Sequence, residues 1–180
     1  DMEGCDYDLY RAKSLRAEAG YPDGGSSTTL AYASVAPYEQ SATIIQANLA
    51  DIGIDVTLEP METATLKSTC VDGKQELFLW RWNEDSKVDF VYRDLFYTGS
   101  GSNYHHYSDS KADEMIDIVA TEKDQAKRLE TAKELQTYLV AACTQVTLYT
   151  ANLVVAYNKN LQGQYFYGCG KHDRHNASIA

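Results

Sequence analysis

The hydrophobic pattern of the first eighty residues alternates between strand-like and helix-like segments. Residues 28–35 are rich in β-forming and small side chains. The next segment repeats apolar side chains at the spacing of one helical face, namely Ala42, Ile45 and Leu49. Ile54–Leu58 then alternates apolar and polar residues, as expected of a half-buried strand. Because a strand–helix–strand order is typical of parallel strands joined by crossover helices, the pattern predicts an α/β fold with a mixed, mainly parallel sheet flanked by helices.

An apolar run is expected to supply a further strand of this sheet. Leu77–Trp82 begins with four consecutive apolar side chains, which is typical of a strand that is covered on both faces and lies centrally. In parallel sheets the loops after the carboxyl ends of the strands form the ligand crevice. The segment from Trp80 to Asp85 has that position in the sequence. A cleft at this segment therefore requires the strand to lie inside the sheet and not exposed at its edge.

The rest of the chain is predominantly helical in pattern. We expect the helix that contains Leu135 to pack on the sheet, as does the helix that contains Ile45. Two short strands, Val146–Thr150 and Leu153–Asn158, are expected to close the fold. Amphipathic spacing predicts helices over residues 8–19, 63–71, 89–96 and 127–142, and another from residue 112 onward.

The acidic balance of the chain excludes several kinds of partner. Lys and Arg number 16 against 26 Asp and Glu, which gives a formal net charge of −10. No basic run offers the footprint that nucleic-acid phosphates require, and an anionic membrane surface would repel the chain. No stretch approaches the roughly 20 apolar residues of a membrane span. Since 180 residues suffice for one core, residues 1–180 are predicted to form a single monomeric domain that binds no nucleic acid.

The sequence holds none of the short motifs that mark common catalytic sites. It contains no GxSxG, Walker loop or HExxH, and no GxGxxG after a strand. A hydrolase built on Glu84 and Asp85 would need a second carboxylate pair or a nucleophile at a motif spacing, and neither is found. We therefore predict that the protein is not an enzyme and uses no cofactor.

The spacing of cysteine and histidine predicts no metal site. The cysteines lie far apart and form no CxxC pair: Cys5, Cys70, Cys143 and Cys169. Their disulfide pairing stays open, including a bridge between the two ends of the chain. Cys70 and Cys143 fall in helical patterns and are expected to be small buried residues. The adjacent histidines His105 and His106 cannot easily face one ion on regular structure, so they are expected at the surface.

Five segments, in order along the chain, are similar to patterns of one protein family. They are Tyr7–Gly24, Ile45–Val56, Asn103–Asp113, Val146–Tyr149 and Tyr157–Gly163. In turn they look like DxxxAKxLLxEAGYPDG, IQxxLxxIGIxV, NxxxYxxxxxD, VPLY and YNKNLKG. The chain thus resembles the peptide/nickel class, family 5, of bacterial extracellular solute-binding proteins. It departs from these patterns at Arg16, where leucine is usual, and at Thr147, where proline is usual.

The resemblance implies a type II periplasmic-binding-protein fold, of which residues 1–180 would be the C-terminal ligand-binding lobe. It implies that the protein captures oligopeptides or similar small solutes in a cleft shared with an N-terminal lobe of the same protein. The membrane permease subunits of an ABC importer would be its partners. The expected location is extracellular, at the cell surface with a lipid anchor in the full-length protein, or periplasmic. The alternative is the ligand-sensing lobe of a transcription regulator, which a basic helix-turn-helix upstream would indicate.

The resemblance also points to ligand-binding residues after the predicted strand. Peptide-binding members hold the free α-amino group of the ligand with a carboxylate shortly after a strand tryptophan, because an ammonium in a closed cleft must keep a charge partner. The residues implied here are Trp80, Trp82, Asn83, Glu84 and Asp85. On a strand the two tryptophans would face the same side. The alternative is that the acidic pair belongs to a solvated turn that caps the following helix.

A basic residue that some relatives use is missing from this sequence. Dipeptide-preferring members resemble one another in an arginine, on the strand before the second helix, that meets the carboxylate of the ligand. The corresponding segment Ala31–Ala36 contains no basic residue. The resemblance therefore implies longer peptides, or ligands that have no carboxylate at that place.

Overall fold

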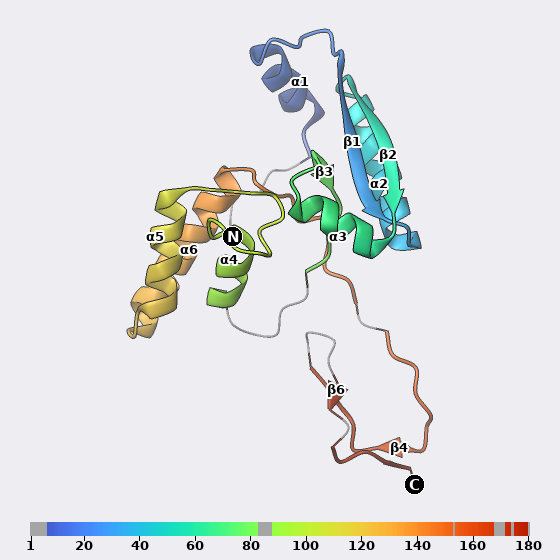
Figure 1. The fold of residues 1–180 in the computed structure, drawn as a ribbon, viewed down its shortest axis with the longest axis vertical. Helices are drawn as coiled ribbons and strands as arrows, with labels where there is room; N and C mark the ends of the chain where they lie inside the picture. Colours follow the sequence, from blue (N-terminus) through green and yellow to red (C-terminus); the bar gives the residue numbers. More distant parts are fainter. Residues whose placement is uncertain (1–6, 83–87, 153, 168–171, 174, 180) are drawn as a thin grey trace. The chain divides into compact units, whose positions relative to one another are not determined.

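The chain divides into two compact units. A computed structural model describes residues 7–82, 88–152, 154–167, 172–173 and 175–179 (Figure 1). The first unit comprises the residues up to Arg81 together with Asp94–Asp109, and the second comprises Trp82–Arg93 together with Ser110–Ala180.

The first unit is built around a parallel sheet. Among the described residues its strands are β1 (Ser26–Ala33), β2 (Ile54–Met61) and β3 (Leu77–Phe78). Their order is β2-β1-β3, and β1 pairs with both neighbours in parallel. Helices α2 (Ala36–Ala50) and α3 (Thr63–Val71) make the crossovers between the strands (Figure 1). The predicted α/β fold, with a parallel sheet and flanking helices, is confirmed.

The core of this unit lies between the sheet and α2. Leu30 and Tyr32 of β1 are buried together with Ala42 of α2, Val56 of β2 and Leu79. Partly buried apolar side chains surround this cluster: Tyr38, Ile45, Leu49, Ile54 and Leu58. The helical stripe and the alternating strand that the sequence predicted thus meet in one cluster.

The second face of β1 is also covered. Ala31 and Ala33 alternate along the strand with the cluster residues and are themselves buried. α3 packs against β1, and its Leu66 is fully buried. β1 is therefore the central strand of the sheet, enclosed on both faces as interior parallel strands are.

The prediction that Leu77–Trp82 forms the central strand is wrong. β3 contains only Leu77 and Phe78, lies at the edge of the sheet, and leaves the Leu77 side chain 40% exposed. The amide of Leu79 still donates to the carbonyl of Ala31 at 2.9 Å. Residues 79–82, however, belong to no strand. An apolar run looks the same in sequence whether strands or other groups bury it. Here Leu79 enters the core beside α2, and Trp80 packs on a loop tyrosine instead of a neighbouring strand.

Two glycines bring together the turns that lead into β1 and β2. Helix α1 (Leu9–Glu18) begins at Asp8, whose carboxylate accepts from the amide of Arg11 at 2.9 Å. Past its end, Gly24 and Gly53 have φ angles of +84° and +76°. A Cβ added to Gly53 would lie only 2.6 Å from the Cα of Gly24. Both the left-handed conformation and the close approach of the two backbones require glycine.

The second unit is helical in its first part. Helix α4 (Val88–Phe96) begins there, and α5 (Ser110–Thr121) and α6 (Gln125–Ala141) pack against each other. Their buried side chains are Ala112, Ile116 and Val119 of α5 with Leu135 and Leu139 of α6. The helix that contains Leu135 therefore packs on α5, and its packing on the sheet stays a prediction. None of the helices in the described part of the chain combines the length and apolar character needed to cross a membrane.

The two predicted closing strands do not form. Residues 145–152 and 154–158 belong to no strand, and the side chains of Val146 and Val154 are 75% and 90% exposed. Alternating apolar residues form a strand only where a neighbouring chain segment supplies hydrogen-bonding partners. The pairs that do form further along are short and antiparallel: β4 (Leu161–Gln162) with β7 (Ser178–Ile179), and β5 (Tyr165–Phe166) with β6 (His172–Asp173).

We expect Gly53→Ala to destabilise the protein more than Gly25→Ala. Both glycines have positive φ angles, +76° and +84°, so each substitution carries backbone strain of about 1–2 kcal/mol. An added Cβ meets nothing within 4 Å at Gly25, whereas at Gly53 it collides with Gly24. Urea unfolding should show an additional loss of about 1–3 kcal/mol for Gly53→Ala. Equal losses in the two variants would contradict the close approach of the turns.

Candidate functional site

The strand order places a switch point beside β1. From β1 the chain passes through α2 to β2 on one side, and then through α3 to β3 on the other side. In open α/β sheets, ligands bind outside the carboxyl ends of the strands where the order reverses in this way. The segments at this place are Ser34–Val35, which follows β1, and Leu79–Arg81, which follows β3. The edge position of β3 removes our argument from a central strand, but the switch point indicates the same region.

Two aromatic side chains meet at the carboxyl end of β3. The ring centroids of Trp80 and Tyr104 lie 5.3 Å apart with an interplanar angle of 86°, an edge-to-face contact. Tyr104 is buried, whereas Trp80 is half-buried. Trp80 is therefore only partly covered, and the buried ring of Tyr104 is one of its contacts.

Tyr104 comes from a segment without helix or strand that is nevertheless closely held. The side chain of Asn103 donates to the carbonyls of Tyr97 and Tyr107 at 3.1 and 2.7 Å, and accepts from the amide of Tyr107 at 3.1 Å. An open hollow of about 260 Å³ lies beside this segment, lined by loop residues and by Val71 of α3. Its lining is rich in hydroxyl groups and glycine: Thr98, Gly99, Ser100, Gly101, Tyr107 and Ser108.

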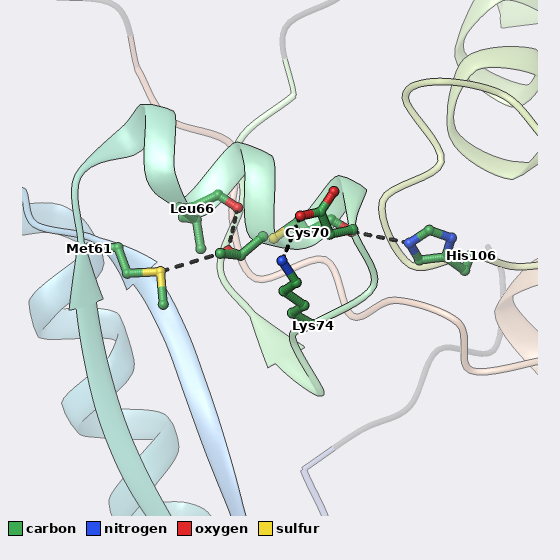
Figure 2. A network of polar contacts seen from close by, with 7 residues as sticks. Met61, Leu66, Cys70, Lys74 and His106 are labelled. Atoms are coloured by element: carbon green, nitrogen blue, oxygen red, sulfur yellow. Dashed lines mark hydrogen bonds and ion pairs between the residues drawn. The ribbon is translucent and has the colours of Figure 1, made fainter.

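A histidine fixes this segment to the end of α3. Figure 2 shows the ring of His106 directed at Cys70, and its Nε2 lies 3.1 Å from the Cys70 carbonyl oxygen. Gly73 stands close by, since a Cβ there would lie 3.3 Å from the same nitrogen. Within α3, the Thr69 hydroxyl donates to the Leu66 carbonyl at 3.0 Å. The neighbouring ion pair between Lys74 and Asp72 is exposed and contributes little to stability.

The two neighbouring histidines occupy different environments. The ring of His105 lies 5.4 Å from that of Phe96, and its Nε2 is buried with no hydrogen-bond partner among the described residues. Burial lowers the pKa of His105 below its usual value of 6.5, and the adjacent His106 lowers it further. The expectation that both histidines lie at the surface is therefore wrong for His105.

The described cysteines differ in the same way. Cys70 is buried with a free thiol, and burial raises its pKa to about 11, so it stays protonated at neutral pH and is no nucleophile. Cys143 follows α6 and is exposed, so the expectation that it is buried is wrong. Cys5 and Cys169 lie outside the described residues. Within the part of the chain that is described, no group of His, Cys, Asp and Glu side chains could hold a metal ion.

The predicted ligand-binding residues are only partly described. Trp80 lies at the carboxyl end of β3, and Trp82 is half-buried in the second unit. Among the described residues, the indole N–H of Trp82 has no hydrogen-bond partner although it is buried. Asn83, Glu84 and Asp85 lie outside the described residues, so their role stays a prediction from the family resemblance.

Sequence reasoning missed the part that Asn103 and Tyr104 play in this site. Both belong to the motif segment Asn103–Asp113, but a pattern does not show that the amide contacts backbone groups only. One feature of the sequence does indicate a special role for Asn103: it is a polar amide that stands between a Gly- and Ser-rich run and several aromatic residues.

Comparison with known proteins identifies relatives of the chain. Residues 1–104 match the family described as bacterial extracellular solute-binding proteins, family 5 Middle. The chain is 25% identical over 187 aligned positions to the dipeptide-binding protein of Escherichia coli, which covers 99% of this chain and 35% of the relative. It is 28% identical over 170 positions to the glutathione-binding protein GsiB of Pectobacterium atrosepticum, covering 88% and 33%. The chain thus spans about a third of the length of these curated relatives.

Solved structures show the same fold. HbpA2 from Haemophilus parasuis superimposes with a TM-score of 0.75 at 22% identity, over 97% of this chain and 36% of that protein. The periplasmic binding protein DppA from Helicobacter pylori, in complex with the peptide STSA, has a TM-score of 0.69 at 27% identity, over 77% and 28%. The type II periplasmic-binding-protein fold that the resemblance implied is confirmed.

We expect His105→Phe to reduce the loss of stability on acidification. The folded protein holds the pKa of His105 below 6.5, so below that pH the unfolded chain binds a proton that the folded state does not. Stability therefore falls as the pH falls, and phenylalanine keeps the ring beside Phe96 without titrating. Thermal unfolding at pH 7.5 and 5.5 should show a smaller fall in Tm for the variant. The same fall in both proteins would contradict the burial of a neutral imidazole.

Proposed function

The chain belongs to family 5 of the bacterial extracellular solute-binding proteins, and on that basis we propose that it captures oligopeptides, or similar small solutes, for an ABC importer. The match over residues 1–104 is the observation that carries the proposal. The names of the relatives support a peptide-like ligand, since one is a dipeptide-binding protein, another a glutathione-binding protein, and a solved structure contains a peptide.

We propose that residues 1–180 form the C-terminal lobe and that an N-terminal lobe of the same protein closes the cleft. The chain spans about a third of its relatives, which supports this division. The whole protein would act as a monomer outside the cytoplasm, lipid-anchored at the cell surface or periplasmic, with the permease subunits as its membrane partners. No finding supports the alternative of a regulator's sensor lobe. The relatives are named as binding proteins, which agrees with capture of a solute and not with catalysis.

The ligand site would combine an aromatic wall with an acidic anchor. Trp80 is half-buried, contacts Tyr104 edge to face and lies at the switch point. Trp82, which the family resemblance implies as a ligand contact, follows two residues later in the sequence. Glu84 and Asp85, with Asn83, follow directly and would pair with the free amino group, which must keep a charge partner in a closed cleft.

The strand beside this site favours peptides longer than two residues. Ala31, Tyr32 and Ala33 at the end of β1 are buried, and Ala31–Ala36 contains no basic residue. The end of β1 thus supplies no cation of its own to meet a carboxylate two residues from the amino group. A longer peptide places its carboxylate elsewhere, so it loses no affinity when a cation is missing from this segment.

We expect the isolated chain of residues 1–180 to bind peptides far more weakly than the full-length protein. Tight small-molecule sites bury most of the ligand surface, and one lobe can cover the ligand from one side only. Isothermal titration calorimetry of both proteins with the same free peptides measures the difference. Micromolar binding by residues 1–180 alone would contradict the two-lobed cleft.

We expect Glu84→Gln combined with Asp85→Asn to cost the full-length protein about 2–5 kcal/mol of peptide affinity, because the ammonium of the ligand loses its partner. The parent should bind free peptides better than N-acetylated ones, and the variant should not distinguish them. Glu130→Gln with Glu134→Gln removes the same charge from an exposed part of α6 and should leave affinity unchanged. Equal binding of free and acetylated peptides by the parent would return the acidic pair to the role of a helix cap.

A further inference from the structure

The segment Tyr97–Ser108 contains an unusual buried polar residue. Asn103 is 5% exposed, and it is the one polar or charged side chain that is buried among the residues that the structure describes. The side-chain amide of Asn103 forms hydrogen bonds with backbone groups of Tyr97 and Tyr107. The amide therefore ties the two ends of an irregular segment together. A buried amide is costly to leave unpaired, so this closed arrangement is strongly favoured.

The tied segment presents one ring to the site. Tyr104 follows Asn103 directly, its amide donates to the carbonyl of Ser102 at 3.0 Å, and its ring is 8% exposed. The ring meets Trp80 edge to face at 5.3 Å. Because the two residues are adjacent, any movement of the backbone at Asn103 moves the Tyr104 ring and releases the indole of Trp80.

A second fastening holds the segment to α3. His106 has a φ angle of +52°, a conformation that residues other than glycine seldom adopt. Its Nε2 contacts the carbonyl of Cys70 at 3.1 Å (Figure 2). The segment is thus held internally by Asn103 and externally by His106. Only the internal fastening lies next to the ring that meets Trp80.

We propose that Asn103 is a positioning residue that holds Tyr104 against Trp80 and thereby sets the affinity for ligands with an apolar or aromatic side chain at this place. The inference rests on the proposed function, because it takes Trp80 as a ligand contact. An aromatic ring gains most from a partner whose orientation is fixed, since stacked and edge-to-face pairs depend on geometry. An indole held by Tyr104 is ordered before the ligand arrives, so less conformational entropy is lost on binding.

The test uses Asn103→Asp in the full-length protein, with Thr98→Val as the matched control. Aspartate keeps the acceptor for the Tyr107 amide but loses both N–H donors of Asn103. Thr98→Val removes an exposed hydroxyl contact to Ser108, 3.2 Å long, from the same segment. Calorimetry with free tripeptides that carry Phe or Ala at each position should show an affinity loss of at least tenfold for the best Phe peptide in Asn103→Asp. The Ala peptides and the control should change much less.

A second readout follows Trp80 without any ligand. In a Trp82→Phe background of the full-length protein, the part of the emission that is lost on adding Trp80→Phe is that of Trp80. Asn103→Asp should shift this emission to longer wavelength and increase its quenching by acrylamide, while Thr98→Val should not. If Asn103→Asp lowers Tm but changes neither the emission nor the preference for Phe over Ala, Asn103 is a structural residue only and the proposal is overturned.

Further variants separate the remaining outcomes. If Asn103→Asp fails to fold, Tyr104→Leu removes the ring and leaves the amide in place, and an unchanged preference for Phe would overturn the proposal. If the parent binds no peptide at all, the proposed function is wrong, and so is the claim that Asn103 sets the affinity for peptides. The emission of Trp80 then decides the positioning of the ring by itself, and an unchanged emission in Asn103→Asp would refute that as well.

Discussion

The parallel pairing of β1 on both of its edges is the constraint on which the first unit depends. β1 pairs with β2 along its whole length and with β3 at Leu30 and Ala31. This pairing aligns the carboxyl ends of the strands, so the segments after β1 and β3 emerge together. At the opposite edge it forces the preceding turns into contact, which only glycine at positions 24 and 53 permits. The candidate site and the close approach of Gly24 and Gly53 thus lie at opposite ends of the same paired strands.

The segments at the carboxyl ends of the strands are held by side chains. Among the described residues, strand pairing ends at β3, and Tyr97–Ser108 forms no helix or strand that would satisfy its backbone groups. A side chain satisfies some of them instead, because the amide of Asn103 supplies the missing donors and acceptor. His106 makes a comparable contact with the end of α3. An irregular segment fastened in this way can present an aromatic ring as rigidly as a strand would.

The sequence was informative where burial follows a period and uninformative where it does not. The stripe at Ala42, Ile45 and Leu49 and the alternation at Ile54–Leu58 predicted the elements that meet in the core. The run at Leu77 gave a strand of the right sheet but not its place, because apolar composition does not say which neighbours bury it. Val146–Thr150 forms no strand, because no segment among the described residues pairs with it. The role of Asn103 was not predictable, because its partners are backbone groups that leave no trace in side-chain identity.

The two ion pairs that are resolved among the described residues lie at the surface, whereas the buried contacts around the candidate site are neutral. The ion pairs Lys74–Asp72 and Arg93–Asp117 are exposed, and pairs of this kind add little to stability. The buried polar residue of the described chain, Asn103, is neutral. A formal net charge of −10 therefore lies largely on the surface, where it can act on ligands and partners at little cost to the core. Affinity from charge and affinity from the wall at Trp80 should then be independent contributions, because no described contact of Trp80 or Tyr104 involves an ionised group.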